Sequence, residues 1–127
     1  MKILLVEDNL LNQKVVTFHL QKKNYKVTGV TNWRDALTNF NNISFDLILM
    51  DIMLPEKNGY EITAEIRKIE EQNKTEKKIP IIAVTANALD NDKDRCLNAG
   101  MDEYLAKPFT SQDLYKMIGK FFKENTN

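Results

Sequence analysis

The sequence has little cysteine, glycine or proline and no excess charge of either sign. A single cysteine, Cys96, excludes an internal disulfide framework and predicts a reducing, cytoplasmic setting. The formal net charge is zero, so we expect neither direct nucleic-acid binding nor membrane contact. No apolar run approaches the ~18 residues that cross a bilayer, and the run after Met1-Lys2 is too short for a signal peptide. Four glycines and three prolines exclude collagen-like and low-complexity sequences.

The 127 residues, 43% apolar and 28% charged, predict one folded domain over 1–122 and a polar C-terminal tail over 123–127. Short apolar runs within this domain predict β-strands. Continuous apolar runs are typical of strands buried on both faces, as in parallel sheets. The predicted strands are 3–6, 27–30, 47–50, 79–84 and 104–106.

Between these runs, apolar residues recur at helical spacing. Capping-type residues precede three of the predicted helices, namely Asn9, Asn32 and Thr110-Ser111, and Asn58-Gly59 predicts a turn into another. The predicted apolar faces are Leu11, Val15, Val16, Phe18 and Leu20; Ala36, Leu37 and Phe40; Ile62, Ile66 and Ile69; Ala88, Leu89, Cys96 and Leu97; and Leu114, Met117, Ile118, Phe121 and Phe122. The stretch from Glu70 to Lys78 has no apolar residue, so we expect a solvated helix end and loop there. Strand and helix alternate five times, which predicts an α/β fold with a five-stranded parallel sheet and helices on both faces.

Polar residues stand at the ends of four of the five apolar runs. Glu7 and Asp8 follow the first run and Asp51 follows the third, while Thr85 and Lys107 end the fourth and fifth. Open parallel sheets bind ligands beyond the carboxyl ends of their strands. We therefore expect three carboxylates, one hydroxyl and one ammonium at a single edge of the sheet.

Three clustered carboxylates repel one another unless a cation neutralises them. Oxygen ligands alone favour a hard ion, Mg²⁺ or Mn²⁺, over Zn²⁺. A nearby Lys and Thr would supply the charge and the hydrogen bond that a phosphoryl group needs. The predicted site therefore combines a metal and a phosphoryl group, with a carboxylate available as the nucleophile.

Five motifs in the expected order identify a family resemblance. Over essentially its whole length the sequence resembles the receiver domains of two-component response regulators, most of all those of hybrid sensor histidine kinases. The motifs are Val6-Glu7-Asp8-Asn9, Met50-Asp51-Ile52-Met53-Leu54-Pro55, Val84-Thr85-Ala86-Asn87, Ala99-Gly100-Met101-Asp102-Glu103-Tyr104 and Ala106-Lys107-Pro108-Phe109.

This resemblance implies a doubly wound, flavodoxin-like (βα)5 fold and a phosphorelay function. Asp51 would accept a phosphoryl group from a histidine kinase or a histidine phosphotransfer protein. Mg²⁺, or Mn²⁺, would be held by Glu7, Asp8, Asp51 and the backbone carbonyl of Met53. The residues implied to bind the phosphoryl oxygens are Thr85 and Lys107, the latter before a proline whose peptide bond is usually cis. Tyr104 would change rotamer with Thr85 as the switch, and no enzymatic turnover is implied beyond self-phosphorylation and autodephosphorylation.

One departure from the family pattern is Lys57-Asn58 before Gly59, where many members have Met-Asp. Asn58 still supports a turn, and Lys57 adds a positive charge that we expect near the site. Outside the site, we interpret His19 as a surface residue and Trp33 as a local anchor beside a helix start.

Three other functions are open to this fold class. A haloacid-dehalogenase-like phosphatase expects a second Asp two residues after the first, where this sequence has Met53. A nucleotide- or flavin-binding module expects a Gly-rich phosphate loop, and the glycines form neither G-x-G-x-x-G nor a P-loop. A scaffold with a decayed site is disfavoured by the complete acid, Thr and Lys set.

Overall fold

The computed structural model describes residues 1–86 and 90–122. The predicted tail and three residues of the predicted motifs and faces, Asn87, Ala88 and Leu89, lie outside the described residues. Strands and helices alternate as predicted: β1 (Lys2–Val6), α1 (Leu10–Lys22), β2 (Lys26–Val30), α2 (Trp33–Asn42), β3 (Leu47–Asp51), α3 (Gly59–Gln72), β4 (Ile81–Thr85), α4 (Asp90–Asn98), β5 (Glu103–Ala106) and α5 (Ser111–Gly119). In the described part of the chain, no helix is long and apolar enough to cross a membrane.

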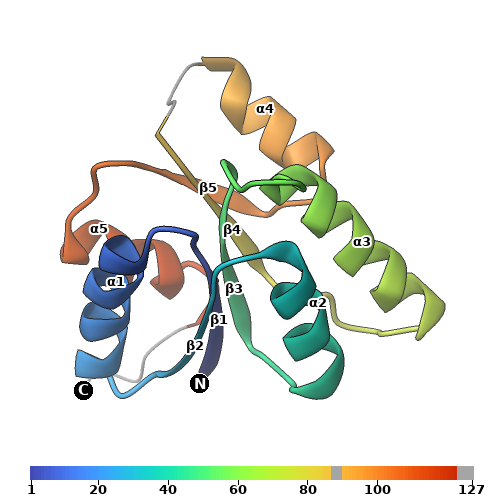
Figure 1. Cartoon of the computed structure of the whole chain (residues 1–127), viewed down its shortest axis with the longest axis horizontal. Helices are drawn as coiled ribbons and strands as arrows, with labels where there is room; N and C mark the ends of the chain where they lie inside the picture. Colours follow the sequence, from blue (N-terminus) through green and yellow to red (C-terminus); the bar gives the residue numbers. More distant parts are fainter. Residues whose placement is uncertain (87–89, 123–127) are drawn as a thin grey trace.

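The sheet is parallel throughout, with the strand order β2-β1-β3-β4-β5. Helices α1 and α5 cover one face, and α2, α3 and α4 lie on the other (Figure 1). The predicted doubly wound fold is therefore confirmed. Because β1 and β3 are neighbours at the centre, their carboxyl ends lie beside each other, with the end of β4 next along the sheet.

Side-chain caps fix the start of four helices, three of them where the sequence predicted a cap and one, at Asn58, where it predicted a turn. The side chains of Asn9, Asn32, Asn58 and Thr110 each accept a hydrogen bond from the backbone N–H three residues later. In α3 and α5 the third helical residue completes a capping box. These caps fix the points at which the chain leaves the loops at the carboxyl edge of the sheet.

Two apolar clusters, one on each face, form the core. On one face, Leu20 of α1 and Leu114 and Ile118 of α5 pack on Ile3, Leu5 and Leu49. On the other face, helices α2, α3 and α4 contribute Ala36, Ile62, Ile66 and Cys96. The predicted faces of α2 and α5 are confirmed, and that of α3 is confirmed at Ile62 and Ile66, while Ile69 is only partly buried. In α4, Cys96 is buried, but Leu97 is 46% exposed, contrary to prediction.

The predicted apolar face of α1 is wrong for three of its five residues. Leu11, Val15 and Phe18 are 71%, 49% and 56% exposed, whereas Leu20 is buried and Val16 is partly buried. The helix covers the sheet with its narrower Val16–Leu20 side. Helical spacing reveals that a helix has an apolar stripe, but not what packs against that stripe. In α1 part of the stripe faces solvent.

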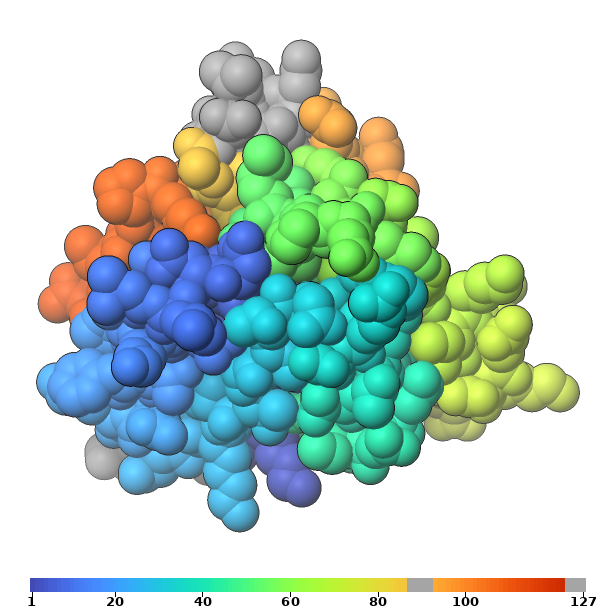
Figure 2. All heavy atoms as spheres, viewed as in Figure 1, coloured from blue at the N-terminus to red at the C-terminus, as the bar shows by residue number. Residues whose placement is uncertain are grey.

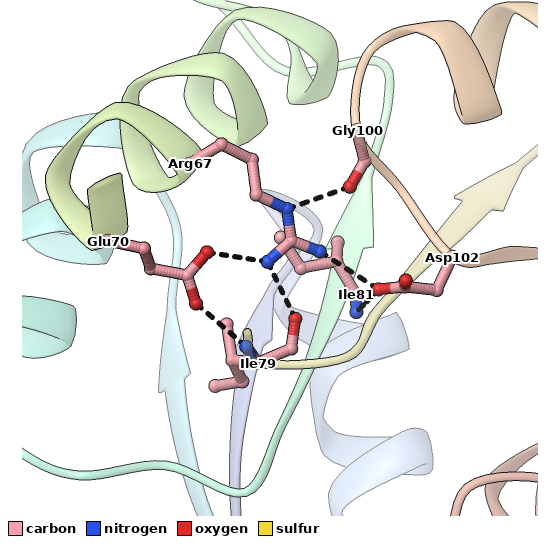
Figure 3. Close-up of polar contacts among 6 residues, drawn as sticks. All are labelled: Arg67, Glu70, Ile79, Ile81, Gly100 and Asp102. Atoms are coloured by element: carbon pink, nitrogen blue, oxygen red, sulfur yellow. Dashed lines mark hydrogen bonds and ion pairs between the residues drawn. The ribbon is translucent and has the colours of Figure 1, made fainter. Parts of the chain in front are cut away.

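A polar cluster around Arg67 joins α3 to the amino-terminal end of β4, at the edge of the sheet opposite the carboxyl ends of the strands (Figure 3). The Arg67 guanidinium donates to the carbonyls of Gly100 and Ile79 at 2.9 and 2.8 Å, and to the carboxylates of Glu70 and Asp102 at 2.7 and 2.9 Å. Glu70 also accepts from the Ile79 N–H at 2.7 Å and is only 4% exposed. The expectation of a fully solvated stretch from Glu70 is therefore wrong at its first residue, because Arg67 neutralises the buried carboxylate.

Candidate functional site

Three carboxylates meet at the carboxyl edge of the central strands, as the sequence predicted. Glu7 and Asp51 are buried, at 5% and 6% exposure, while Asp8 is exposed. One oxygen from each carboxylate lies within 4.8 Å of the others. The strand order produces this cluster, since β1 and β3 are adjacent and end at the same edge.

The loop that carries Glu7 and Asp8 is held by backbone and side-chain bonds to β2. The Glu7 N–H donates to the Val30 carbonyl at 3.0 Å. The Gln13 amide donates to the carbonyls of Glu7 and Val30 at 3.2 and 3.0 Å, and a Cβ on Gly29 would lie 2.6 Å from the Gln13 side chain. Gln13 was not predicted as a site residue. The sequence shows only a polar amide near the start of a helix, and the structure places that amide on the partly buried side of α1.

Asp51 is oriented by its own loop. Its Oδ1 accepts from the Met53 N–H at 3.0 Å, and the loop returns so closely that a Cβ on Gly59 would lie 2.5 Å from the Asp51 carbonyl oxygen. Only glycine permits this approach of α3 to the end of β3. The Met53 side chain is 67% exposed, so Met53 contributes to the site through its backbone and not through its side chain.

Lys107, the residue that follows β5, reaches the carboxylates. Its Nζ lies 3.1 Å from Glu7 Oε1 and 3.6 Å from Asp51 Oδ2, and its N–H donates to the Thr85 carbonyl at 2.7 Å. The Lys107–Pro108 peptide bond is cis, as the resemblance implied. Thr85 itself is buried at the end of β4, so the structure brings the predicted acid, hydroxyl and ammonium groups to one edge.

The electrostatics of the cluster separate its two buried acids. Burial raises the pKa of Asp51 from 3.8 to about 7. The hydrogen bond that the protonated Asp51 carboxyl donates to Glu7 and the negative charge of Glu7 act in the same direction, whereas the Met53 N–H and Lys107 act to lower it. Burial also acts to raise the pKa of Glu7, but hydrogen bonds with Asp51 and Lys107 outweigh it and lower that pKa. Burial acts to lower the pKa of Lys107, but Glu7 and Asp51 outweigh it and raise that pKa. Glu7 and Lys107 therefore form the charged pair, and Asp51 is the carboxyl that keeps its proton up to about pH 7.

The cluster fits a hard divalent cation. Glu7 Oε2 is buried without a hydrogen-bond partner among the described residues, and such an atom needs a ligand or proton donor. Oxygen donors alone, two buried and one exposed, suit Mg²⁺ with retained waters better than a closed Zn²⁺ site. A cavity of about 500 Å³ adjoins these residues, with Val15 and Phe109 among its apolar walls.

The remaining predicted residues lie around this centre. Ala106 is the register partner of Thr85, and Tyr104 lies two residues earlier on β5, partly buried against the core. Lys57 is engaged elsewhere, because its ammonium pairs with Glu65 and lies 4.3 Å from the centroid of the Trp33 ring. His19, which we expected to be a surface residue, is partly buried and lines the cavity.

Comparison with curated sequences finds relatives among histidine kinases. The chain is 38% identical over 133 residues to hybrid signal transduction histidine kinase I of Dictyostelium discoideum, covering 98% of this chain and 8% of that protein. It is 41% identical over 123 residues to peroxide stress-activated histidine kinase mak1 of Schizosaccharomyces pombe, covering 91% of this chain and 7% of that protein. The chain thus spans less than a tenth of the length of either kinase.

Solved structures and a family model agree with these relatives. The receiver domain of sensor histidine kinase PA1611 from Pseudomonas aeruginosa PAO1, with a magnesium ion coordinated in its active site cleft, is 42% identical with a TM-score of 0.84, covering 97% of this chain and 98% of that one. The Saccharomyces cerevisiae Ssk1 receiver domain, solved with the histidine phosphotransfer protein Ypd1, is 31% identical with a TM-score of 0.90, covering 95% and 88%. The family model for the response regulator receiver domain matches residues 3–119. With its fold, its acidic edge and this match in agreement, the chain belongs to the response regulator receiver domain family.

Proposed function

We propose that residues 1–122 act as one receiver unit in which Asp51 accepts a phosphoryl group from a phosphohistidine. The observation that carries this proposal is the placement of Asp51. Its carboxylate is buried between the Met53 N–H and the Lys107 ammonium, and two further acids lie within 4.8 Å. In the transfer, an Asp51 oxygen forms a bond to phosphorus while the nitrogen–phosphorus bond breaks and its electron pair stays on the donor imidazole.

Mg²⁺, or Mn²⁺ in its place, would be held by Glu7, Asp8 and Asp51 with the backbone carbonyl of Met53. When bound, the ion supplies positive charge that neutralises the phosphoryl oxygens. Lys107 stabilises the same oxygens, and the Thr85 hydroxyl binds one of them. The domain is thus a phosphoacceptor that catalyses its own phosphorylation and dephosphorylation, with no other turnover.

The exposed side of α1 supports a protein donor. Leu10, Leu11, Val15 and Phe18 are 49–71% exposed, and the helix starts three residues after Glu7. An apolar surface beside the phosphoacceptor suits a histidine kinase or a histidine phosphotransfer protein, the kind of partner to which the Ssk1 receiver is bound. A reduced, buried Cys96 and a phosphohistidine donor fit a cytoplasmic domain without nucleic-acid or membrane contact.

The output of the switch is proposed to run through Thr85 and Tyr104. A phosphoryl group that draws the Thr85 hydroxyl inward leaves space towards which the partly buried Tyr104 ring turns. A partner that binds the α4–β5–α5 surface must then prefer one of the two arrangements. Amide shifts with and without beryllofluoride test this; an unmoved Tyr104 contradicts the switch and leaves the phosphoacceptor role intact.

Mass spectrometry tests the phosphoacceptor directly. With a small phosphodonor and Mg²⁺, the chain should gain one phosphoryl group on Asp51, and Asp51→Asn or a chelator should abolish the gain. Asp94→Asn, which changes an exposed acid of α4, is the control and should label normally. Undiminished labelling of Asp51→Asn would overturn the assignment.

A second experiment tests the donor surface. Leu11→Ser with Val15→Ser should slow transfer from a phosphorylated histidine phosphotransfer protein about tenfold or more, with the rate from the small donor unchanged. Leu97→Ser, at an exposed apolar residue of α4, is the matched control. Equal transfer rates in both variants would contradict docking on α1.

A further inference from the structure

Glu56 has an unusual backbone conformation in the loop between β3 and α3. Its φ is +67°, in the left-handed region that non-glycine residues rarely adopt. The described part of the chain has two other such residues, Asn24 and Lys74, of which Asn is well suited to this conformation. A left-handed Glu persists only where surrounding contacts hold it.

The first turn of α2 supplies those contacts. Trp33 Nε1 donates to Glu56 Oε2 at 2.9 Å, and Arg34 lies 3.8 Å from the same oxygen. The Trp33 ring is flanked by cations, with Lys57 Nζ at 4.3 Å and the Arg34 guanidinium carbon at 4.9 Å from its centroid. Figure 2 shows the green β3–α3 segment against the cyan α2 segment on this face of the molecule.

The restrained Glu56 belongs to a closed loop that contains Met53. The Gly59 and Leu54 N–H groups both donate to the Ile52 carbonyl, at 3.0 and 3.1 Å. The Met53 N–H is committed to Asp51 at 3.0 Å. Because both ends of the loop are fixed in this way, the conformation of Glu56 restricts the backbone at Met53.

We infer that Trp33 and Glu56 are positioning residues that hold the β3–α3 loop in its metal-binding shape. The inference rests on the proposed function, in which the Met53 carbonyl is a metal ligand. Neither side chain is proposed to touch the ion. Instead, their hydrogen bond orders the loop before the metal binds, so that less of the free energy of Mg²⁺ binding is spent on ordering it. The inference also gives Lys57 a role away from the phosphoryl group, as part of the packing around Trp33.

Metal titration with an NMR readout tests the inference without any phosphoryl transfer. Amide shifts of the apo protein are followed against Mg²⁺ concentration for the wild type, Trp33→Phe and Glu56→Ala. We expect the Kd for Mg²⁺ to rise about three- to tenfold in both variants. Glu56→Gln, which retains an oxygen acceptor for Trp33, should stay within about twofold of the wild type.

A glycine pair separates positioning from simple stability. Glu56→Gly removes the left-handed strain together with the hydrogen bond, so its Mg²⁺ affinity should fall while its unfolding midpoint holds or rises. Lys74→Gly relieves similar strain in the α3–β4 loop and should leave Mg²⁺ affinity unchanged.

The outcomes distinguish this inference from the proposed function. Unchanged Mg²⁺ affinity in Trp33→Phe and Glu56→Ala, with the wild type binding normally, overturns the positioning role alone. A wild type that binds no Mg²⁺ overturns the proposed metal site and the inference with it.

Discussion

Asp51→Asn should stabilise the metal-free protein at alkaline pH. The folded state raises the pKa of this carboxyl from 3.8 to about 7, so between these values the folded protein holds a proton that the unfolded chain has lost. Stability therefore falls as pH rises through this window and is constant above it. Asparagine cannot ionise, and its amide can donate to Glu7 as the protonated carboxyl does, so the variant keeps the low-pH arrangement at every pH.

The size of the effect follows from the pKa interval. From pH 5 to about 7 the wild type loses about 1.4 kcal/mol per pH unit, an upper bound of about 3 kcal/mol. The adjoining cavity admits water and reduces the desolvation of Asp51, so we expect a loss of about 1–3 kcal/mol. Glu7 adds little to this window, because its lowered pKa lies below 4.5.

Urea unfolding in EDTA at pH 5 and pH 8 measures the prediction. The wild type should be less stable at pH 8, and Asp51→Asn should exceed it there by about the same 1–3 kcal/mol. Mg²⁺ at pH 8 should raise the stability of the wild type and have little effect on that of the variant. Asp94→Asn, at an exposed acid, should follow the wild type. Equal pH dependence in Asp51→Asn and the wild type would refute the reasoning.

Three further substitutions test other parts of the structure. Asp8→Asn should weaken Mg²⁺ binding about tenfold or more in NMR titrations, while the apo melting temperature holds or rises because one repelling charge is gone; a lower apo melting temperature with unchanged affinity would make Asp8 only a structural residue. Gly59→Ala should cost about 2 kcal/mol in urea unfolding and slow phosphorylation, since the new Cβ would lie 2.5 Å from the Asp51 carbonyl oxygen; Gly119→Ala, with open space around it, is the control and should not destabilise. Arg67→Met should cost about 3 kcal/mol because it leaves Glu70 buried and unpaired; a loss no larger than that of Lys68→Met, on the exposed side of α3, would contradict this.

The fold and the acidic edge could be predicted because both follow from local pattern. Continuous apolar runs give parallel strands, and the residue after each strand then has a known edge, which places Asp51 and Lys107 without any tertiary information. The α1 surface could not be predicted in the same way, since Val15 and Leu20 are equally apolar in the sequence. Which of them is covered depends on how the helix lies on the sheet.

Contacts between distant segments were also beyond the sequence. Trp33 and Glu56 are 23 residues apart, and their hydrogen bond depends on one left-handed residue in a loop. Glu70 stands in a polar stretch, and only the arrangement of Arg67 shows that its carboxylate is buried. Polar side chains satisfied by remote backbone groups leave no periodic signal.

The Arg67 cluster has a consequence for how the domain unfolds. The guanidinium joins partners that lie 12, 33 and 35 residues further along the chain, so its bonds form only when β4 and the α4–β5 turn have docked on α3. Contacts that complete such long loops late in folding affect the unfolding rate more than the folding rate. We therefore expect Arg67, on the edge opposite the phosphoacceptor, to slow unfolding and so prolong the lifetime of the native state, while the carboxyl edge can still change shape.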